Sequence, residues 1–571
     1  MASFFSRFNP INAFPAYHGP YPVGTVDVEI PAADLPQPCE TPEDAPPTVA
    51  FRIFYPCVKP SSSETDRPVR WIARPQRLNV AALIKFLGIS ERKSSALSYL
   101  TQWFYWININ AHRNAQIHSP PTTNGRWPVT FFSHGLAGSR NAYSYICGDM
   151  ASNGMIVVAL DHRDGSSPVQ YVRATDKTDA YGISAIKISH EACNAVWEAR
   201  DKQLRIRLWE ISLAYEALMK IDAGEKVENL DENTSQSRRS RVEVLQRFAE
   251  TMDIQRPGKV SWAGHSFGAC TMVQTIKSVF YARERPADAG NPLIKPAPDA
   301  AISQQITPDS PTIMLDMWGL PFQSPQQRYL WERPMPSYAH GGPKGSNLLS
   351  ILSEGFANWQ SNTNTNKYLI AAPSRSRRPS RAPTMVREPG QILPQWARLR
   401  DESPSGDSGY ASSERSPARS PTRIQSGGSG SGDSVEESSR HAGPHMFFVQ
   451  RSQHFSQSDF GILFPQIARY LAKAEEPERI MELNTRAIVQ MLRENGVEVT
   501  TAREGGAGDV EILDAESQIR RWKRIAVHDN EGRTVGERLE GADEKLEIAK
   551  GEDAAPKDDI AIARTKTGLE T

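Results

Sequence analysis

Residues 259–280 read KVSWAGHSFGACTMVQTIKSVF, in which a β-forming run leads through a tight turn into a helix-forming run. The turn, 264–268, reads GHSFG and matches the pattern GxSxG. A sharp strand-to-helix turn of this kind holds its serine in a strained backbone conformation and exposes the hydroxyl above a sheet. Glycine at either side lets the strand and the helix approach closely. The stretch therefore predicts a nucleophilic serine, Ser266, at the end of a strand.

Short apolar runs of β-forming residues lie on both sides of this turn. They cover 49–55, 129–133, 156–160, 311–316, 347–352 and 445–449. Apolar residues at three- and four-residue spacing predict helices over 200–222 and 477–495. Strands that alternate with helices indicate an α/β protein, whose mainly parallel sheet is covered by helices on both faces.

A nucleophilic serine needs a histidine to accept its proton, and the histidine needs a carboxylate to orient it. When the serine lies on such a turn, the order along the chain is serine, acid, histidine. We expect His454 to be the base, because it lies in a loop after the last predicted strand, 445–449. The other histidines that follow Ser266 are His340, His441 and His445.

Two carboxylates are candidates for the acid. Asp316 ends the predicted strand 311–316, and Glu354 follows the predicted strand 347–352. The carboxyl ends of neighbouring parallel strands meet at one edge of a sheet, so either side chain fits the required place. The residues by themselves leave the choice between them open.

The negative charge that develops on a reacting ester carbonyl needs two N–H donors. One donor is expected from Phe267, directly after the nucleophile, and the other from the loop that follows an earlier strand. That loop begins at Ser133 and reads SHGLAG, which makes the N–H of Leu136 the second candidate.

Composition narrows the classes of protein. Among 571 residues, Lys+Arg and Asp+Glu are 66 each, so the balance of charge argues against nucleic acid as a partner. The five cysteines show no CxxC spacing, and serine chemistry needs no metal or other cofactor, so we expect none. We see no signal peptide and no transmembrane run, which favours a cytoplasmic protein with peripheral lipid contact at most.

The composition also changes along the chain. Residues 373–444 are rich in Ser, Arg and Pro and contain few large apolar side chains, which predicts a disordered insertion. We therefore expect a catalytic domain in two parts, 15–372 and 445–526, and a charged flexible tail over 527–571. The Ser-Pro and Arg-rich sites within the insertion are either targets of kinases or parts of a solvated linker that carries no regulation.

Four segments carry a family resemblance. They read FSHGLAGSRNAYSYICGDMASNGMIVVALDHRDGS, WAGHSFGA, MLDMW and SQHFSQSDFGILFP. In this order they resemble the platelet-activating factor acetylhydrolases of the plasma and intracellular type II group. The resemblance spans most of 15–360 and 445–525 and implies an α/β-hydrolase fold. The chain departs from the family at the insertion and at a charged stretch over 222–256.

The resemblance also implies roles for particular residues. It implies a catalytic triad of Ser266, Asp316 and His454, with Leu136 and Phe267 as oxyanion donors. Asp316 is favoured over Glu354 because it is the aspartate of the LD-x-W element.

The activity that the resemblance implies is calcium-independent hydrolysis of the sn-2 ester of glycerophospholipids with an acetyl or oxidised acyl group. One alternative is a broader carboxylesterase or lipase on the same fold. Another is a catalytically idle scaffold that is regulated by phosphorylation of 373–444.

A stripe of apolar and aromatic residues near residue 100 recurs at helical spacing. From the residues alone, core packing is the favoured interpretation of the stripe. Aromatic side chains also suit the boundary between lipid headgroups and acyl chains, and the resemblance places an interface-contacting helix here. We therefore expect contact with a membrane or lipoprotein-like surface from Leu97, Leu100, Trp103, Phe104, Trp106 and Ile107.

Overall fold

The computed structural model describes residues 14–60, 68–72, 74–86, 90–373, 443–500, 511–514, 519–528 and 534–535. The predicted insertion and most of the predicted tail lie outside these residues, and so do the candidate kinase sites.

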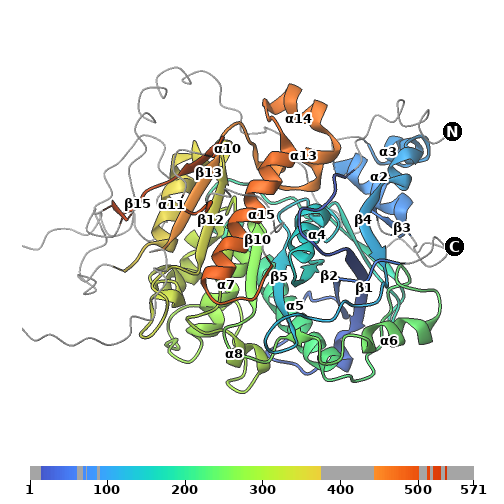
Figure 1. Ribbon diagram of the computed structural model, residues 1–571, viewed down its shortest axis with the longest axis horizontal. Helices are drawn as coiled ribbons and strands as arrows, with labels where there is room; N and C mark the ends of the chain where they lie inside the picture. The colour runs from blue at the N-terminus through green and yellow to red at the C-terminus, as the bar shows by residue number, and fades with distance from the viewer. Residues whose placement is uncertain are drawn as a thin grey trace, which may run out of the picture.

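A large central sheet organises the described part of the chain (Figure 1). Its strands lie in the order β14-β13-β12-β11-β10-β5-β6-β2-β1-β4-β3. Neighbours from β13 to β6 run parallel, whereas β2 and β1 are antiparallel to their neighbours on the β6 side. The bounds are β1 Val23–Pro31, β2 Thr48–Pro56, β3 Pro68–Arg70, β4 Asn108–Arg113, β5 Trp127–Ser133, β6 Ile156–Leu160, β10 Ser261–His265, β11 Thr312–Leu315, β12 Leu348–Ser353, β13 His445–Val449 and β14 Trp522–Arg524.

Shorter strands lie beside or outside this path. β9 (Met252–Asp253) pairs with β5, while β7 (Val169–Val172) pairs with β8 (Tyr181–Ser184) and β15 (Val527–His528) with β16 (Thr534–Val535).

Helices cover both faces of the sheet, which is the α/β-hydrolase fold that the sequence predicts. The apolar side chains of α5 and α7 pack on one face, and those of α4 and α15 pack on the other. The helices are α2 Gln76–Phe86, α3 Glu91–Leu100, α4 Ser144–Ser152, α5 Asn194–Asp222, α6 Arg238–Gln246, α7 Phe267–Phe280, α8 Ala301–Gln305, α9 Arg328–Trp331, α10 Glu354–Ala357, α11 Gln360–Ile370, α13 Asp459–Leu463, α14 Pro465–Ala472 and α15 Pro477–Glu494.

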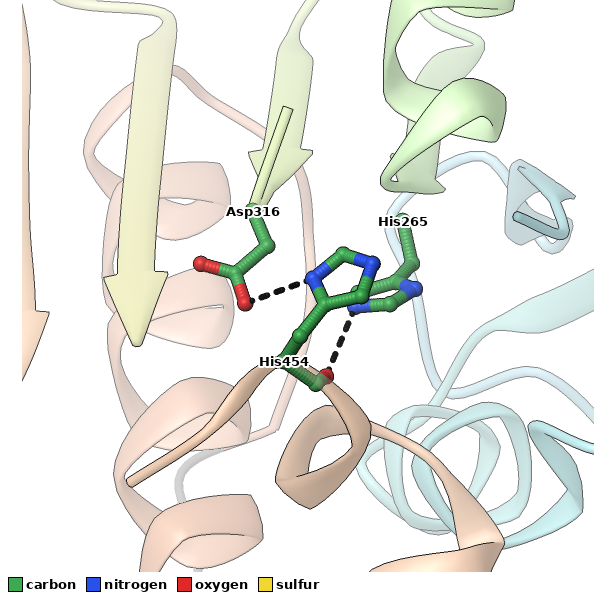
Figure 2. A group of neighbouring side chains, drawn as sticks. All are labelled: His265, Asp316 and His454. Carbon is green, nitrogen blue, oxygen red and sulfur yellow. Dashed lines mark hydrogen bonds and ion pairs between the residues drawn. The ribbon is translucent and has the colours of Figure 1, made fainter. Parts of the chain in front are cut away.

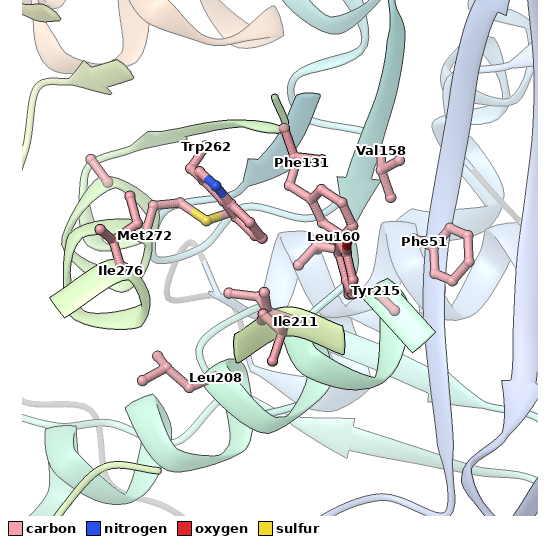
Figure 3. Packing of buried hydrophobic residues seen from close by; sticks show 14 of the residues in the cluster. Phe51, Phe131, Val158, Leu160, Leu208, Ile211, Tyr215, Trp262, Met272 and Ile276 are labelled. Carbon is pink, nitrogen blue, oxygen red and sulfur yellow. The ribbon is translucent and has the colours of Figure 1, made fainter. Parts of the chain in front are cut away.

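The alternation of side chains along each strand divides the core into two layers. Phe131 lies in the layer under α5 and α7, and its neighbour Phe132 lies in the layer under α4 and α15. Figure 3 shows the first layer, where the rings of Phe131 and Trp262 stack with centroids 5.1 Å apart. Both side chains are fully buried, and each stabilises the fold by about 1.5–3 kcal/mol or more. The strands at the centre of the sheet are thereby held from both sides.

The structure confirms each strand that the sequence predicts. It also contains strands that sequence reasoning missed, among them β1. Along β1, apolar side chains alternate with Thr25, Asp27 and Glu29, a pattern typical of a strand with one face in water. Here both faces are buried, because Asp27 and Glu29 find partners inside the protein.

Asp27 belongs to a network of buried charges that joins β1 to β2 and to the loop after β5. Arg52 of β2 donates to Asp27 through Nε at 2.7 Å and through Nη2 at 3.1 Å. Arg140 Nη1 lies 3.6 Å from Asp27 Oδ1, and Arg140 Nη2 donates to Asp231 Oδ2 at 2.7 Å. Since a buried charge without a partner is costly, these contacts fix β1 and β2 relative to that loop.

The stripe near residue 100 departs from the expected single helix. Helix α3 ends at Leu100, and a separate 3₁₀ turn, η2, covers Gln102–Trp106. The prediction of one continuous helical face is therefore wrong. Among the described residues, no helix combines the length and the apolar character that crossing a bilayer requires.

Replacement of Asp27 by alanine should destabilise the protein by about 3–5 kcal/mol, because Arg52 would be left buried without its carboxylate. Denaturant unfolding of wild type and Asp27→Ala measures this loss. The pair Asp27→Leu and Arg52→Met, made together, should recover most of it. A single variant within about 1 kcal/mol of wild type would contradict the argument.

Candidate active site

The turn around Ser266 has the geometry that its sequence predicts. Strand β10 ends at His265, helix α7 begins at Phe267, and Ser266 between them has φ 57° and ψ −120°. An L-residue rarely adopts this conformation, so the surrounding structure must hold it in place. A Cβ on Gly268 would lie 2.0 Å from the carbonyl oxygen of Ser133, a separation that only glycine permits.

The acid and the base come from two other strand ends. Asp316 directly follows β11, and His454 begins the 3₁₀ turn η6 (His454–Gln457) after β13. His454 Nε2 lies 2.9 Å from Ser266 Oγ, and His454 Nδ1 lies 3.0 Å from Asp316 Oδ2. Figure 2 shows the Asp316 carboxylate aimed at the His454 ring. The structure thus brings together three residues that sequence reasoning selected separately.

Hydrogen-bond chemistry fixes the tautomer of His454. A carboxylate accepts and does not donate, so Nδ1 carries the proton and Nε2 accepts from the Ser266 hydroxyl. The second oxygen of Asp316 accepts from the backbone N–H of Ser353 at 2.5 Å, and the Asp316 side chain is fully buried. Glu354 is engaged elsewhere, since it accepts from the N–H of Arg451 at 2.7 Å. Of the two candidate acids, Asp316 is the one that contacts His454.

The two predicted oxyanion donors lie on elements that meet beside the nucleophile. Phe267 opens α7, where the first N–H groups of a helix have no intrahelical partner. The loop that contains Leu136 passes close to Ser266, because a Cβ on Gly135 would lie 2.9 Å from the Cβ of Ser266.

Arg207, a residue of α5 that sequence reasoning missed, supports both of these elements. Its Nη1 donates to the carbonyl oxygen of His134 at 2.8 Å, and its guanidinium carbon lies 4.4 Å from the centroid of the Phe267 ring. Arg207 is fully buried and pairs with Asp164 at 2.6 Å. Burial acts to raise the pKa of Asp164, but the charge of Arg207 and the hydrogen bond from Ser166 outweigh it and lower that pKa.

A second serine–histidine–carboxylate chain lies beneath the first. His162 Nε2 is 2.8 Å from Ser133 Oγ, and His162 Nδ1 is 2.9 Å from Glu210 Oε2. All three side chains are buried at 0–1 % exposure, so no substrate reaches this serine. The chain instead ties the end of β5 to α5 and keeps the following loop in place.

His265, Asp316 and His454 offer side-chain atoms within 4.8 Å of one another, a spacing that a metal ion could use. Their hydrogen bonds favour a different use. Both nitrogens of His454 already face Ser266 and Asp316, and His265 Nε2 faces the carbonyl oxygen of His454 at 3.1 Å. The donor set fits a histidine base with its orienting partner better than a metal centre.

A further contact holds the base. The ring of Phe356, on α10, stacks on the His454 ring at 4.2 Å between centroids with an interplanar angle of 5°. Sequence reasoning had no signal for this contact, because Phe356 belongs to no motif and approaches His454 only through the fold.

The predicted lipid-interface residues divide into two groups. Leu97 and Phe104 are partly buried against the core, and Ile107 is buried at 8 % exposure. Trp106 is 67 % exposed. The side chains of Leu100 and Trp103 lie outside what the structure describes.

The fold and this site define the class of protein: a serine carboxylic ester hydrolase with the α/β-hydrolase fold. Within that class, the chain belongs to the family described as platelet-activating factor acetylhydrolase, isoform II, whose match covers residues 7–335.

Two proteins that are similar in sequence bear names of phospholipid ester hydrolases. The chain is 26 % identical over 505 residues to a Schizosaccharomyces pombe protein named "Putative phospholipase A2", with 86 % of this chain and 94 % of the relative covered. It is 32 % identical over 228 residues to the platelet-activating factor acetylhydrolase of Cavia porcellus, with 40 % of this chain and 46 % of the relative covered. The structure of a ferulic acid esterase from Streptomyces cinnamoneus aligns with a TM-score of 0.41 at 13 % identity, covering 89 % and 98 % of the two chains.

Gly268→Ala should lower hydrolysis of a soluble ester such as p-nitrophenyl acetate by about 100-fold or more. The added methyl group would push α7 away from the end of β5 and displace the oxyanion donors, and an error of about 1 Å costs that much. Steady-state kinetics on the purified variant test this.

A suitable control is Gly182→Ala, because a Cβ there meets nothing nearer than Val169 Cγ2 at 3.3 Å. That variant should keep wild-type rates. Equal rates for both alanine variants would show that the close approach at Gly268 is unimportant.

Proposed function

We propose that this protein hydrolyses the sn-2 ester of glycerophospholipids that carry a short or oxidised acyl group, with Ser266, His454 and Asp316 as its triad. The observation that carries the proposal is the hydrogen-bonded chain from Asp316 through His454 to Ser266. The names of the relatives, a phospholipase A2 and acetylhydrolases, support a phospholipid substrate.

In the first half of the reaction, Ser266 Oγ attacks the ester carbonyl while His454 Nε2 takes the hydroxyl proton. The N–H groups of Leu136 and Phe267 hold the oxyanion, and each such donor contributes about 3–4 kcal/mol in the transition state. His454 then gives its proton to the departing lysophospholipid oxygen, which leaves an acyl group on Ser266. Asp316 stays ionised and stabilises the imidazolium throughout this half.

In the second half, water replaces the alcohol. His454 Nε2 takes a proton from the water as its oxygen attacks the acyl carbonyl, and the same two N–H groups stabilise the new oxyanion. His454 returns the proton to Ser266 Oγ, and the fatty or acetic acid is released. The side chain of His454 is 38 % exposed, which is consistent with entry of this water.

Docking on a lipid surface is the second part of the proposal. Trp106 at 67 % exposure and Tyr470 at 87 % are the most exposed of the large apolar or aromatic side chains in the described part of the chain. They lie on η2 and on α14, and Phe104 of η2 contacts Phe464, the residue just before α14, with ring centroids 5.8 Å apart. Helix α14 follows the His454 turn after α13, and this nearness in the chain supports docking on the side of the molecule that carries the proposed base.

The decisive experiment measures acyl release from 2-acetyl and 2-palmitoyl phosphatidylcholine in EDTA. Wild type should prefer the acetyl substrate, and Ser266→Ala should lose at least about 1000-fold of that activity, because no nucleophile remains. Labelling by a fluorophosphonate should disappear in the same variant.

Other outcomes would point to the rival functions. Equal rates on both lipids would indicate a general phospholipase or lipase. No hydrolysis and no labelling of wild type would indicate a catalytically idle protein.

Trp106→Ala combined with Tyr470→Ala should weaken binding to phosphatidylcholine vesicles several-fold and leave hydrolysis of a soluble ester unchanged, because neither side chain belongs to the triad or to the oxyanion donors. Flotation of vesicles with bound protein measures the binding. The control is Val58→Ser: Val58 is 45 % exposed, and it follows the end of β2 that lies at the amino end of β6, opposite the catalytic edge. Unchanged vesicle binding by the double variant would contradict the proposed surface.

A further inference from the structure

His265, the residue before the nucleophile, belongs to a hydrogen-bond chain that the mechanism above does not use. Its Nε2 lies 3.1 Å from the carbonyl oxygen of His454, and its Nδ1 lies 2.8 Å from the hydroxyl of Tyr143. That hydroxyl lies 3.2 Å from the backbone nitrogen of Gly135. Figure 2 shows His265 beside His454, with its contact to the His454 carbonyl as a dashed line. The chain joins the loop of the base to the loop of the oxyanion donor.

The chemistry of the partners fixes every proton in this chain. A carbonyl oxygen accepts and does not donate, so His265 Nε2 carries a proton and donates to His454. His265 Nδ1 is then an acceptor, and the hydroxyl of Tyr143 donates a hydrogen bond to it. The Tyr143 oxygen in turn accepts from the N–H of Gly135. Each group therefore has a single role, and the donors run in one direction from Gly135 to His454.

The surroundings keep His265 neutral. Tyr143 and His265 are each 3 % exposed. Burial, and after it the charge of His454, holds the pKa of His265 well below its ordinary value. A protonated His265 would lose its acceptor for Tyr143, and it would repel the imidazolium of His454 across a ring separation of 4.4 Å. Neutrality preserves both hydrogen bonds at the moment when His454 becomes charged.

We infer that Tyr143 and His265 are positioning residues, which hold the oxyanion loop and the base loop in register around Ser266. The inference rests on the proposed function, because it assigns Leu136 and His454 their roles. Tyr143 fixes the peptide nitrogen of Gly135, one residue before Leu136. His265 fixes the carbonyl of the base itself. Neither side chain touches the reacting atoms, and their effect on rate comes from the placement of groups that do.

Three variants separate the links of the chain. Tyr143→Phe removes the hydroxyl and with it both of its hydrogen bonds. His265→Asn keeps an acceptor near the position of Nδ1 and loses the donor to His454. His265→Gln keeps a donor near the position of Nε2 and loses the acceptor for Tyr143. We expect Tyr143→Phe to lower kcat by about 10–100-fold and to change KM by less than about twofold, because the groups that it displaces act in the transition state.

The leaving group distinguishes the two loops. An alkyl alcohol needs a proton from His454 as it departs, whereas p-nitrophenolate departs without one. His265→Asn should therefore slow hydrolysis of 2-acetyl phosphatidylcholine more than that of p-nitrophenyl acetate, and His265→Gln should restore much of the difference. Tyr143→Phe should slow both reactions by similar factors. The double variant Tyr143→Phe/His265→Asn should lose less kcat than the product of the two single fold-losses, because both residues belong to one hydrogen-bond chain.

Tyr145→Phe is the matched control. Tyr145 is buried on α4, two residues beyond Tyr143, and its hydroxyl donates to the carbonyl oxygen of Ala16 at 3.2 Å. The Tyr145→Phe variant also loses a buried tyrosine hydroxyl, but one outside the hydrogen-bond chain of His265, and it should keep the wild-type kcat. The ratio of the two substrates is independent of how much of a variant is folded, so partial unfolding cannot imitate the result.

The outcomes for the inference and for the proposed function are distinct. Wild-type kcat and an unchanged substrate ratio in Tyr143→Phe and His265→Asn would overturn the positioning roles and leave the proposed function standing. A wild-type protein that neither hydrolyses esters nor reacts with a fluorophosphonate would overturn both.

Discussion

The close approach between the start of α7 and the end of β5 is the constraint on which the rest of the site depends. It is possible because residue 268 has no Cβ, and a methyl group there would collide with the carbonyl of Ser133. This approach places the N–H of Phe267 and the loop of Leu136 on either side of one serine. It also forces Ser266 into its strained conformation, which directs the hydroxyl toward His454. The proposed nucleophile and both proposed oxyanion donors thus depend on a single packing contact.

Buried charge is the second organising feature, and the buried arginines that orient backbone or side-chain groups are themselves paired with carboxylates. Arg207 lies between the two oxyanion elements and is neutralised by Asp164, so it orients the carbonyl of His134 without leaving an unpaired cation in the core. Arg52 and Arg140 are likewise paired with carboxylates, Asp27 and Asp231, where β1 and β2 meet the loop after β5. The polar groups under the active site are therefore fixed partners rather than adaptable ones, and such fixed dipoles need little reorganisation as charge moves during a reaction.

Much of this could be predicted from the sequence, and the exceptions have physical reasons. The parallel strands are continuous apolar runs, and the order of Ser266, Asp316 and His454 follows from the fold. The choice between Asp316 and Glu354 could not be made from spacing, because both residues follow neighbouring strands. Strand β1 has the alternation of a strand with one face in water, but its spacing could not show that Asp27 and Glu29 are buried, because their ion-pair partners come together only in the tertiary structure. The stripe near residue 100 failed as a single helix because α3 ends before the 3₁₀ turn that contains Trp106.

The position of β13 in the sheet has a consequence for how the site is assembled. Ser266 and Asp316 precede residue 373, whereas His454 comes after residue 443, and β13 joins the sheet by pairing with β12. The proposed base is thus carried by a different stretch of chain from the proposed nucleophile and acid. A break anywhere between the two stretches would leave each piece with part of the site and a complementary sheet edge. Hydrolysis would then report on their reassociation, as in an enzyme divided into two fragments.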